Sequence, residues 1–232
     1  AFSGQTTDFH TGGVDLIFPH HTNEIAQSQP VYKPFVRHWA HCEHLQIDSK
    51  KMAKRNGNFF TLADLEKNVA NSRIAFRYAV LQSHYKSQMN FTWESLQASS
   101  HALEKLYDFV RNSTEAIRES GCEEYEELFL KAVNNDLNTA QALSYVWQML
   151  NNTNYSDGQK LHSLFKFDEV LGLGLKTPPM LVVPAEIKKL LEERQAARDT
   201  KNFATSDQLR IEIEISGFEL MDTPDGQKLK KK

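Results

Sequence analysis

No apolar run in the 232-residue sequence approaches the length of a membrane span, and no signal-peptide pattern opens the chain. A helix needs about 20 consecutive apolar residues to cross the hydrocarbon core of a bilayer. We therefore expect a cytoplasmic protein without membrane contact. Hydrophobic residues make up 40% of the sequence, a fraction typical of globular proteins.

The sequence also contains few cysteines and carries little net charge. Cys42 and Cys122 are the only cysteines and lie far apart in the sequence, which argues against a disulfide framework. We expect Cys42 to be packed in the interior. The formal net charge is −3, from 27 Lys and Arg against 30 Asp and Glu. A slightly acidic chain does not indicate nucleic-acid binding, so any contact with RNA must come from local patches.

Residues 10–28, which read HTGGVDLIFPHHTNEIAQS, hold a dense group of potential functional side chains. The apolar run Val14–Phe18 predicts a short buried strand, and the residues after it predict a helix. On that helix His20 lies four residues and His21 three residues before Glu24, so imidazole and carboxylate share one face. Zinc binds both ligand types, although a zinc site needs at least three ligands. The alternative is a polar first turn, with Glu24 at the positive end of the helix dipole.

This stretch resembles the segment HGGGxDLxFPHHENEIAQS of cysteinyl-tRNA synthetases, a family of class I aminoacyl-tRNA synthetases. It departs from that segment at Thr11, where the family has Gly, and at Thr22, where the family has Glu. The resemblance implies roles for five residues: His20 and Glu24 bind a catalytic zinc, His10 lies near the bound cysteine, and Gly13 and Asp15 face the ATP.

A second polar group, LQIDSKKMAKRNGN, covers residues 45–58. Leu45 and Ile47 alternate as in a strand, and Asn-Gly-Asn marks a turn. The residues between them include four cations within six positions, which can neutralise a triphosphate. The alternative is a solvated basic loop without a ligand.

This second stretch resembles the KMSKS loop of class I aminoacyl-tRNA synthetases, and Trp39 and His41 match the Trp-x-His that precedes it in the family. The sequence here reads KMAKR, so Ala53 and Arg55 replace the two serines. The resemblance implies that two cations act in catalysis, namely Lys51 and Lys54, of which Lys54 binds the ATP phosphates.

From Phe60 onward the pattern is helical for more than a hundred residues. A capping-box-like start at Thr61–Asp64 opens this region, and Asn138 or Thr139 is the expected N-cap of a later helix. Apolar residues recur from Leu96 to Val110 at the spacing of a bundle seam. We expect helices near residues 73–81, 93–110, 125–133, 140–150 and 158–171, and the last four form an antiparallel bundle.

Glycines and prolines between residues 172 and 184 predict a linker. A helix is expected to start at Pro184. The segment Asn202–Ile215 is ambiguous, because its end alternates like a strand while its start is helical in pattern; we expect a helix, as in the family. Residues 218–221, a turn and the residues from Gln227 onward predict a small hairpin.

Together these features predict an α/β plus mostly α fold. We expect the C-terminal part of a Rossmann-like class I synthetase catalytic domain at 1–60, a helical connective region and bundle at 61–172, a linker at 173–183, and a small α+β anticodon-binding domain at 184–232. The HxGH motif and the two zinc-binding cysteines that the family carries upstream are absent from the sequence. The chain is therefore expected to be part of a longer enzyme.

The resemblance implies the activity of a cysteine–tRNA ligase, with zinc as cofactor. In this reaction ATP, with Mg²⁺, activates L-cysteine to cysteinyl-adenylate, and the cysteine is transferred to tRNA(Cys). We expect a monomer. One alternative is the cysteine ligase of mycothiol biosynthesis, which shares the catalytic core but lacks the extension of about fifty residues after the linker. Another is a non-catalytic RNA-binding or scaffolding module.

Five residues after the linker match family positions that contact the anticodon. An exposed aromatic ring can stack on a loop base, Arg can bind a base edge or a phosphate, and Asp can accept from an exocyclic amine. In the alternative interpretation the aromatic residue belongs to the core, and the first Asp forms a surface ion pair with the Arg three residues later. The five residues are Arg198, Phe203, Asp207, Arg210 and Asp222.

Overall fold

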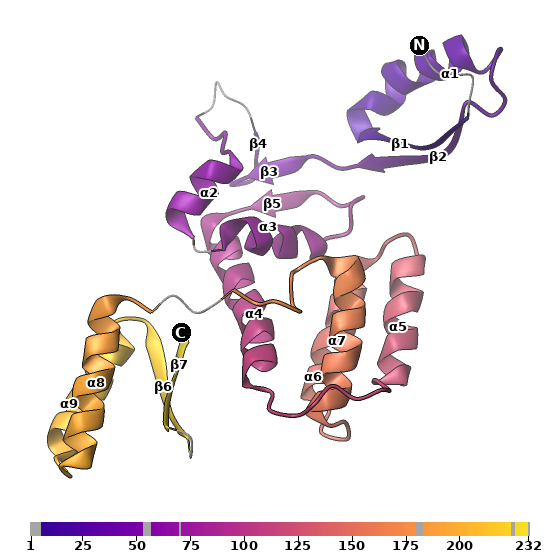
Figure 1. Cartoon of the computed structure of the whole chain (residues 1–232). Coiled ribbons are helices and arrows are strands. Elements are labelled where there is room, and N and C mark those ends of the chain that lie inside the picture. Colours follow the sequence, from indigo (N-terminus) through magenta and orange to yellow (C-terminus); the bar gives the residue numbers. More distant parts are fainter. Residues whose placement is uncertain (1–5, 53–56, 70, 180–182, 224–225, 232) are drawn as a thin grey trace. The chain divides into compact units, whose positions relative to one another are not determined.

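The computed structural model describes residues 6–52, 57–69, 71–179, 183–223 and 226–231 (Figure 1). The chain divides into two compact units. The first combines residues 1–100 with 115–173, and the second combines residues 101–114 with 174–232. Within the described ranges, no helix is both long enough and apolar enough to cross a membrane.

A parallel pair of strands begins the first unit. These strands are β1 (Thr7–Gly13) and β2 (Val36–Cys42), and Thr7 lies opposite Val36 and Gly13 opposite Cys42. Between the strands the chain forms a 3₁₀ turn (Val14–Leu16), a wider turn (Ile17–His21) and helix α1 (Thr22–Ser28). The short helix α1 is thus part of the connection between two strands that pair directly with each other.

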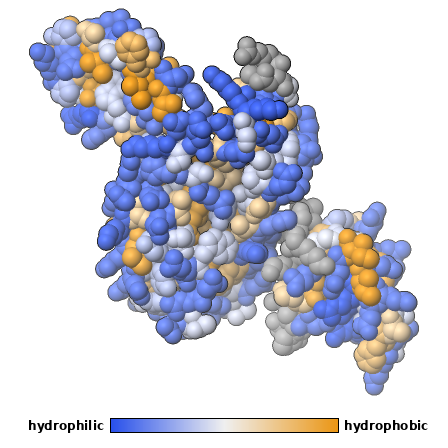
Figure 2. Space-filling model, turned by 180° about the vertical axis from the view of Figure 1, so that it is seen from behind, coloured by the Kyte–Doolittle hydropathy of each residue, from blue (hydrophilic) through white to orange (hydrophobic). Residues whose placement is uncertain are grey.

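The strand predicted at Val14–Phe18 is wrong, because β1 ends at Gly13 and the chain coils immediately afterwards. Ile17 and Phe18 are exposed, Phe18 by 76%. Apolar side chains are visible on the surface of this part of the first unit in Figure 2. A short apolar run does not by itself distinguish a buried strand from other local structure. The observed strand, TDFHTGG, lacks the regular apolar alternation that would have revealed it.

A second sheet in the first unit has the strand order β4–β3–β5. Its strands are β3 (Leu45–Ile47), antiparallel to β4 (Lys50–Lys51) and parallel to β5 (Met89–Phe91). Helices α2 (Leu62–Asn68) and α3 (Ser72–Leu81) contact each other beside it. The predicted capping box is confirmed, since the Thr61 hydroxyl accepts from the Asp64 amide while the Asp64 carboxylate accepts from the Thr61 amide.

Four longer helices follow, close to their predicted positions. They are α4 (Trp93–Asn112), α5 (Glu123–Asn134), α6 (Thr139–Asn151) and α7 (Asp157–Leu171). In the first unit α5, α6 and α7 contact one another (Figure 1). The Asn138 side chain caps α6 by accepting from the Gln141 amide, as predicted. Along α4 the leucines of the predicted seam are buried, although Val110 is only half-buried.

The second unit ends in two helices and a hairpin. These are α8 (Ala185–Asp199), α9 (Phe203–Ile215), β6 (Phe218–Thr223) and the antiparallel β7 (Gly226–Lys231). Ile187, Ile213 and Phe218 form the buried centre of this group. The helix chosen for the ambiguous segment 202–215 and the small hairpin are both confirmed. In the expected linker, Leu173 and Leu175 are fully buried, so its first residues are part of the packed structure.

Candidate active site

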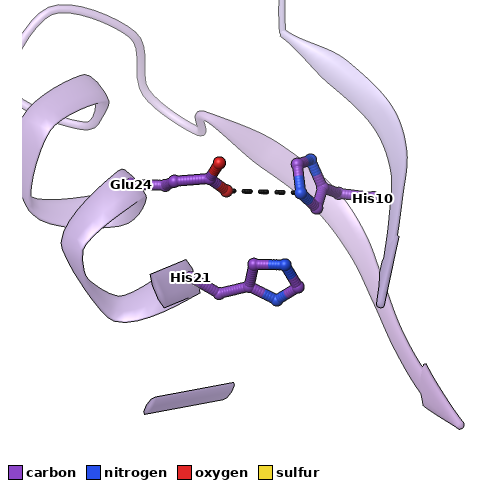
Figure 3. Close-up of side chains that lie close together, drawn as sticks. All are labelled: His10, His21 and Glu24. Atoms are coloured by element: carbon purple, nitrogen blue, oxygen red, sulfur yellow. Dashed lines mark ion pairs between the residues drawn. The ribbon is translucent and has the colours of Figure 1, made fainter. Parts of the chain in front are cut away.

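A cluster of side chains that could hold a metal ion lies where β1, the turn after it and α1 meet (Figure 3). His10 projects from β1, His21 from the end of the turn and Glu24 from α1. One ligand atom from each residue can be chosen so that all three lie within 4.8 Å of one another. The His10 Nε2 atom lies 3.2 Å from the Glu24 Oε2 atom. The three residues are therefore close enough to share one ion.

The parallel pairing of β1 with β2 places residues of β2 against this cluster. It places His10 opposite Trp39 and Gly12 opposite His41. The ring centroids of His10 and Trp39 are 4.8 Å apart, and those of His21 and Trp39 are 5.0 Å apart. A Cβ atom on Gly12 would lie 2.8 Å from the His21 Cε1 atom, closer than such atoms approach. The absence of a side chain at Gly12 is therefore what admits the His21 ring.

His21 is the most deeply buried of the clustered histidines, with 3% of its surface exposed. Its Nδ1 atom lies 2.7 Å from the Nε2 atom of His41, so one ring donates a hydrogen bond to the other. Burial lowers the pKa of His21, and the neighbouring His10 and His41 lower it further, because each would repel a second positive charge. At neutral pH a neutral His21 ring keeps a lone pair for a proton or a metal ion.

The donor set fits zinc. Glu24 Oε2 is a buried carboxylate oxygen that has no hydrogen-bond partner among the described residues, since the nearby His10 nitrogen does not have bonding geometry. A buried oxygen of this kind is costly unless a proton or a cation compensates it. Imidazole nitrogens and a carboxylate oxygen are ordinary zinc ligands. The residues of this site are therefore chemically suited to the metal that the resemblance implies.

The adjacent residues His20 and His21 differ sharply in environment. His20, the predicted ligand, has a 60% exposed side chain, and its Nε2 atom lies 3.4 Å from the Glu24 Oε1 atom. The predicted pair is therefore in contact, as its four-residue spacing requires. His21 faces His10 and the buried oxygen of Glu24 instead. Sequence reasoning gave His21 no role of its own, because the orientation of its ring depends on β1 and β2, whose pairing was not predicted.

The other predicted residues of the first unit lie at its surface. Asp15 is exposed in the 3₁₀ turn that follows Gly13, and its Oδ1 atom lies 3.7 Å from the His44 Nε2 atom. Lys51 is exposed on β4, at the start of the cation-rich loop. Lys54 lies outside the described residues.

The expectation that Cys42 is packed in the interior is wrong. Its side chain is exposed at the end of β2, and its thiol lies 3.6 Å from the Gly12 carbonyl oxygen. The general preference of cysteine for the interior does not apply here because Cys42 is the last residue of a two-stranded sheet.

Three of the five predicted anticodon contacts, Arg198, Arg210 and Asp222, have partners within the second unit. Both carboxylate oxygens of Asp222 accept from the buried Arg194 at 3.1 Å, and Arg198 also pairs with Asp222. Arg210 pairs with Glu214 at 3.2 Å and donates to the Leu220 carbonyl oxygen. Arg194, which is 3% exposed, was missed because its burial depends on the hairpin.

Phe203 and Asp207 have a different setting on α9. Phe203 is 64% exposed, which excludes the alternative that it belongs to the core. Asp207 is also exposed. Arg210 pairs with Glu214, four residues after it, rather than with the Asp207 of the alternative interpretation. An exposed ring and an exposed carboxylate thus share the first two turns of this helix.

Comparison with known proteins gives the same assignment along the whole chain. Residues 1–101 match the family of class I (C) tRNA synthetase catalytic domains. The whole chain is 39% identical to the cysteine–tRNA ligase of Chlamydia muridarum (strain MoPn / Nigg) and covers 54% of it. Over 97% of its length the chain is 43% identical to the cysteine–tRNA ligase of Opitutus terrae (strain DSM 11246 / JCM 15787 / PB90-1) and covers 49% of it.

A solved structure agrees at the level of the fold. The crystal structure of a LeuRS–tRNA–LeuAMS ternary complex from Agrobacterium radiobacter K84 matches with a TM-score of 0.54 at 15% identity. The match covers 72% of this chain and 26% of that one. The predicted likeness to class I synthetases is confirmed in this coarse form, and the arrangement of the domains stays a prediction.

The chain spans about half the length of the curated relatives it matches. Its sequence similarity to them nevertheless extends from one end of the chain to the other. The predicted resemblance is confirmed by these relatives and by the family match over residues 1–101. The chain is therefore similar to cysteine–tRNA ligases over its whole length, and its first 101 residues match the catalytic-domain family of class I (C) tRNA synthetases.

Proposed function

We propose that this chain is part of an enzyme that joins L-cysteine to tRNA(Cys). In the first step a carboxylate oxygen of cysteine attacks the α-phosphorus of ATP, and pyrophosphate leaves. In the second step a hydroxyl of the terminal ribose attacks the carbonyl carbon of cysteinyl-adenylate, and AMP leaves. The observation that carries the proposal is identity of 39% over the entire chain with a cysteine–tRNA ligase, together with the His10–His21–Glu24 cluster.

In this proposal His20 and Glu24 supply zinc ligands, and His10 lies beside the substrate cysteine. Held by these residues, a zinc ion would supply a Lewis acid that prefers the soft thiolate of cysteine to the hydroxyl of serine. The Oε2 atom of Glu24, which is buried and has no hydrogen-bond partner among the described residues, is consistent with a cation here. A hydrogen bond with His41 orients the ring of His21 beside Glu24.

The ATP would lie against Gly13, Asp15 and the cation-rich loop. Lys51 and Lys54 would stabilise the negative charge that develops on the departing pyrophosphate, with Mg²⁺ on the phosphates. Support comes from the position of Lys51, which is exposed on a strand whose neighbours are fixed by the sheet.

The second unit supports tRNA, rather than an amino sugar, as the cysteine acceptor, because it adds a helix pair and a hairpin to the catalytic part. Phe203 and Asp207 are exposed and available to a loop base. Arg198, Arg210 and Asp222 would contribute partly by shaping the same surface, since each has a partner within the unit. We place the enzyme in the cytoplasm, as a monomer.

Cysteine-dependent exchange of pyrophosphate into ATP tests the first step. The full-length protein should catalyse this exchange with L-cysteine and should discriminate strongly against L-serine, because the hydroxyl is a poor ligand for the proposed metal. Charging of tRNA(Cys) tests the second step. Exchange that is equally fast with serine, or that is absent with both amino acids, would contradict the proposal.

A further inference from the structure

The cation-rich loop begins at a strained turn. Asp48 and Ser49 connect β3 to β4 as a two-residue hairpin, with Ile47 paired opposite Lys50. Both turn residues have positive φ values, 48° for Asp48 and 59° for Ser49. Such turns favour Asn-Gly, because glycine adopts this conformation without a steric cost. Asp is tolerated at such φ values, whereas Ser is not among the residues that commonly adopt them.

The side chain of Asn90 holds this turn from β5. Its Oδ1 atom accepts a hydrogen bond from the Ser49 amide at 2.7 Å, and its Nδ2 atom donates to the Ser49 hydroxyl at 3.4 Å. The Asp48 amide donates to the carbonyl oxygen of Phe91 at 3.1 Å. Two successive residues of β5 therefore bind both residues of the turn. Because β5 is parallel to β3, with Asn90 opposite Gln46, the side chain reaches along the sheet to the end of β3.

The turn determines where Lys51 lies. β4 consists of only two residues, Lys50 and Lys51, which pair with Ile47 and Gln46. So short a strand contributes little pairing energy of its own, and its direction depends on the turn that precedes it. On the far side, the Nδ2 atom of Asn58 donates to the Lys51 carbonyl oxygen at 3.2 Å. The backbone of Lys51 is thus fixed from both sides.

We propose that Asn90 is a positioning residue for Lys51, on which it acts through the Asp48–Ser49 turn. This inference rests on the proposed function, because it assigns Lys51 to the ATP phosphates. Without the Asn90 acceptor, the strained Ser49 loses its compensating hydrogen bond. The turn then opens, and Lys51 spends less time where it stabilises the departing pyrophosphate.

Substitutions at Asn90 and Ser49 separate this role from general stability. Asn90→Asp keeps an oxygen acceptor for the Ser49 amide, whereas Asn90→Leu removes it at similar size; Asn90→Ala serves if the leucine variant does not fold. Ser49→Gly removes the strain itself. The matched control is Gln88→Ala, which removes an exposed amide that accepts from Gln46 on β3 at 3.2 Å without contacting the turn.

The first measurement is hydrogen exchange of the segment containing Ser49 and Lys51 in the full-length protein. Exchange should be faster in the leucine variant and unchanged in the Asn90→Asp and Gln88→Ala variants. The second measurement is cysteine-dependent pyrophosphate exchange. The leucine variant should show a kcat about twofold to tenfold lower, as expected for one net hydrogen bond, with the KM for cysteine unchanged. Adding Ser49→Gly to it should restore kcat.

Unchanged hydrogen exchange in the leucine variant would overturn the inference, and so would a loss of kcat that neither Asp at position 90 nor Gly at position 49 reverses. Lys51→Ala distinguishes this failure from failure of the proposed function. If Lys51→Ala leaves pyrophosphate exchange intact, the role proposed for Lys51 is wrong and activity can no longer support the inference. Hydrogen exchange would still decide whether Asn90 holds the turn.

Discussion

Replacement of Asp222 by Ala should destabilise the second unit, because this carboxylate is the partner of a buried guanidinium. Arg194 is 3% exposed and donates to both oxygens of Asp222 at 3.1 Å. Its Nε atom already lacks a hydrogen-bond partner among the described residues. Removing the carboxylate would leave Arg194 with Gln227 as its remaining side-chain partner in this cluster.

The size of the effect follows from the exposure of the pair. Removing one partner of a fully buried ion pair costs about 3–5 kcal/mol. Asp222 is 35% exposed, so solvent screening lowers the expected loss to about 2–3 kcal/mol. In a unit of this size that loss corresponds to a fall in Tm of very roughly 10–20 °C. Asp222→Asn, which keeps one acceptor oxygen, should lose less.

Hydrogen exchange of α8 and β6 is the appropriate assay, because it reports on the second unit separately from the first. Asp222→Ala should accelerate exchange in both elements. The control is Asp207→Ala, an exposed change on α9 that should alter stability by no more than about 0.5 kcal/mol. Unchanged protection in the Asp222→Ala variant, combined with weaker tRNA binding, would refute the structural reasoning and make Asp222 a direct contact.

The same pair predicts a dependence on pH. The hydrogen bond from Arg194 and the charges of Arg194 and Arg198 lower the pKa of Asp222 below its usual value. A carboxylate whose pKa is depressed by folding contributes stability above the unfolded pKa of about 3.9. This contribution should decline as the pH falls from that value through the folded pKa, and it should be missing from the Asp222→Asn variant.

Three further predictions concern the full-length enzyme. His20→Ala or Glu24→Ala should sharply lower zinc content and cysteine activation; a zinc content that depends on His21 and not on His20 would instead identify the buried histidine as the ligand. Lys54→Ala should slow adenylate formation by about 10²- to 10³-fold with little effect on cysteine binding, whereas equal effects would indicate a structural role. Phe203→Ala should weaken tRNA(Cys) binding by about 1–3 kcal/mol without altering adenylate formation, and unchanged affinity would exclude stacking.

Local signals explain which elements could be predicted from the sequence. The capping side chains at Thr61 and Asn138 mark helix starts wherever they occur, because they satisfy backbone amides within the same turn. At these two positions the decisive contact lies within a few residues in the sequence. The local pattern of segment 202–215 is ambiguous instead, and the helix expected there, which the structure confirms, follows from the family resemblance.

The errors have a common physical cause as well. The strand Thr7–Gly13 exists because it pairs with Val36–Cys42, and no residue within β1 shows this pairing in advance. The same pairing turns His21 toward His10 and leaves Cys42 exposed at the end of β2. Arg194 likewise acquires its partner from a hairpin 28 residues later in the chain. These features depend on contacts between distant segments, which short sequence patterns do not report.

The alternation of β1 divides its glycine-rich end into tolerant and intolerant positions. Thr11, which departs from the family motif, is exposed, so an extra side chain there displaces nothing. Gly12, one residue later, points to the opposite face, where a methyl group would occupy the space of the His21 ring. In a mutational scan, position 11 should therefore accept many residues, whereas position 12 should reject even alanine. Two adjacent residues of one motif thus differ greatly in the substitutions that the site tolerates.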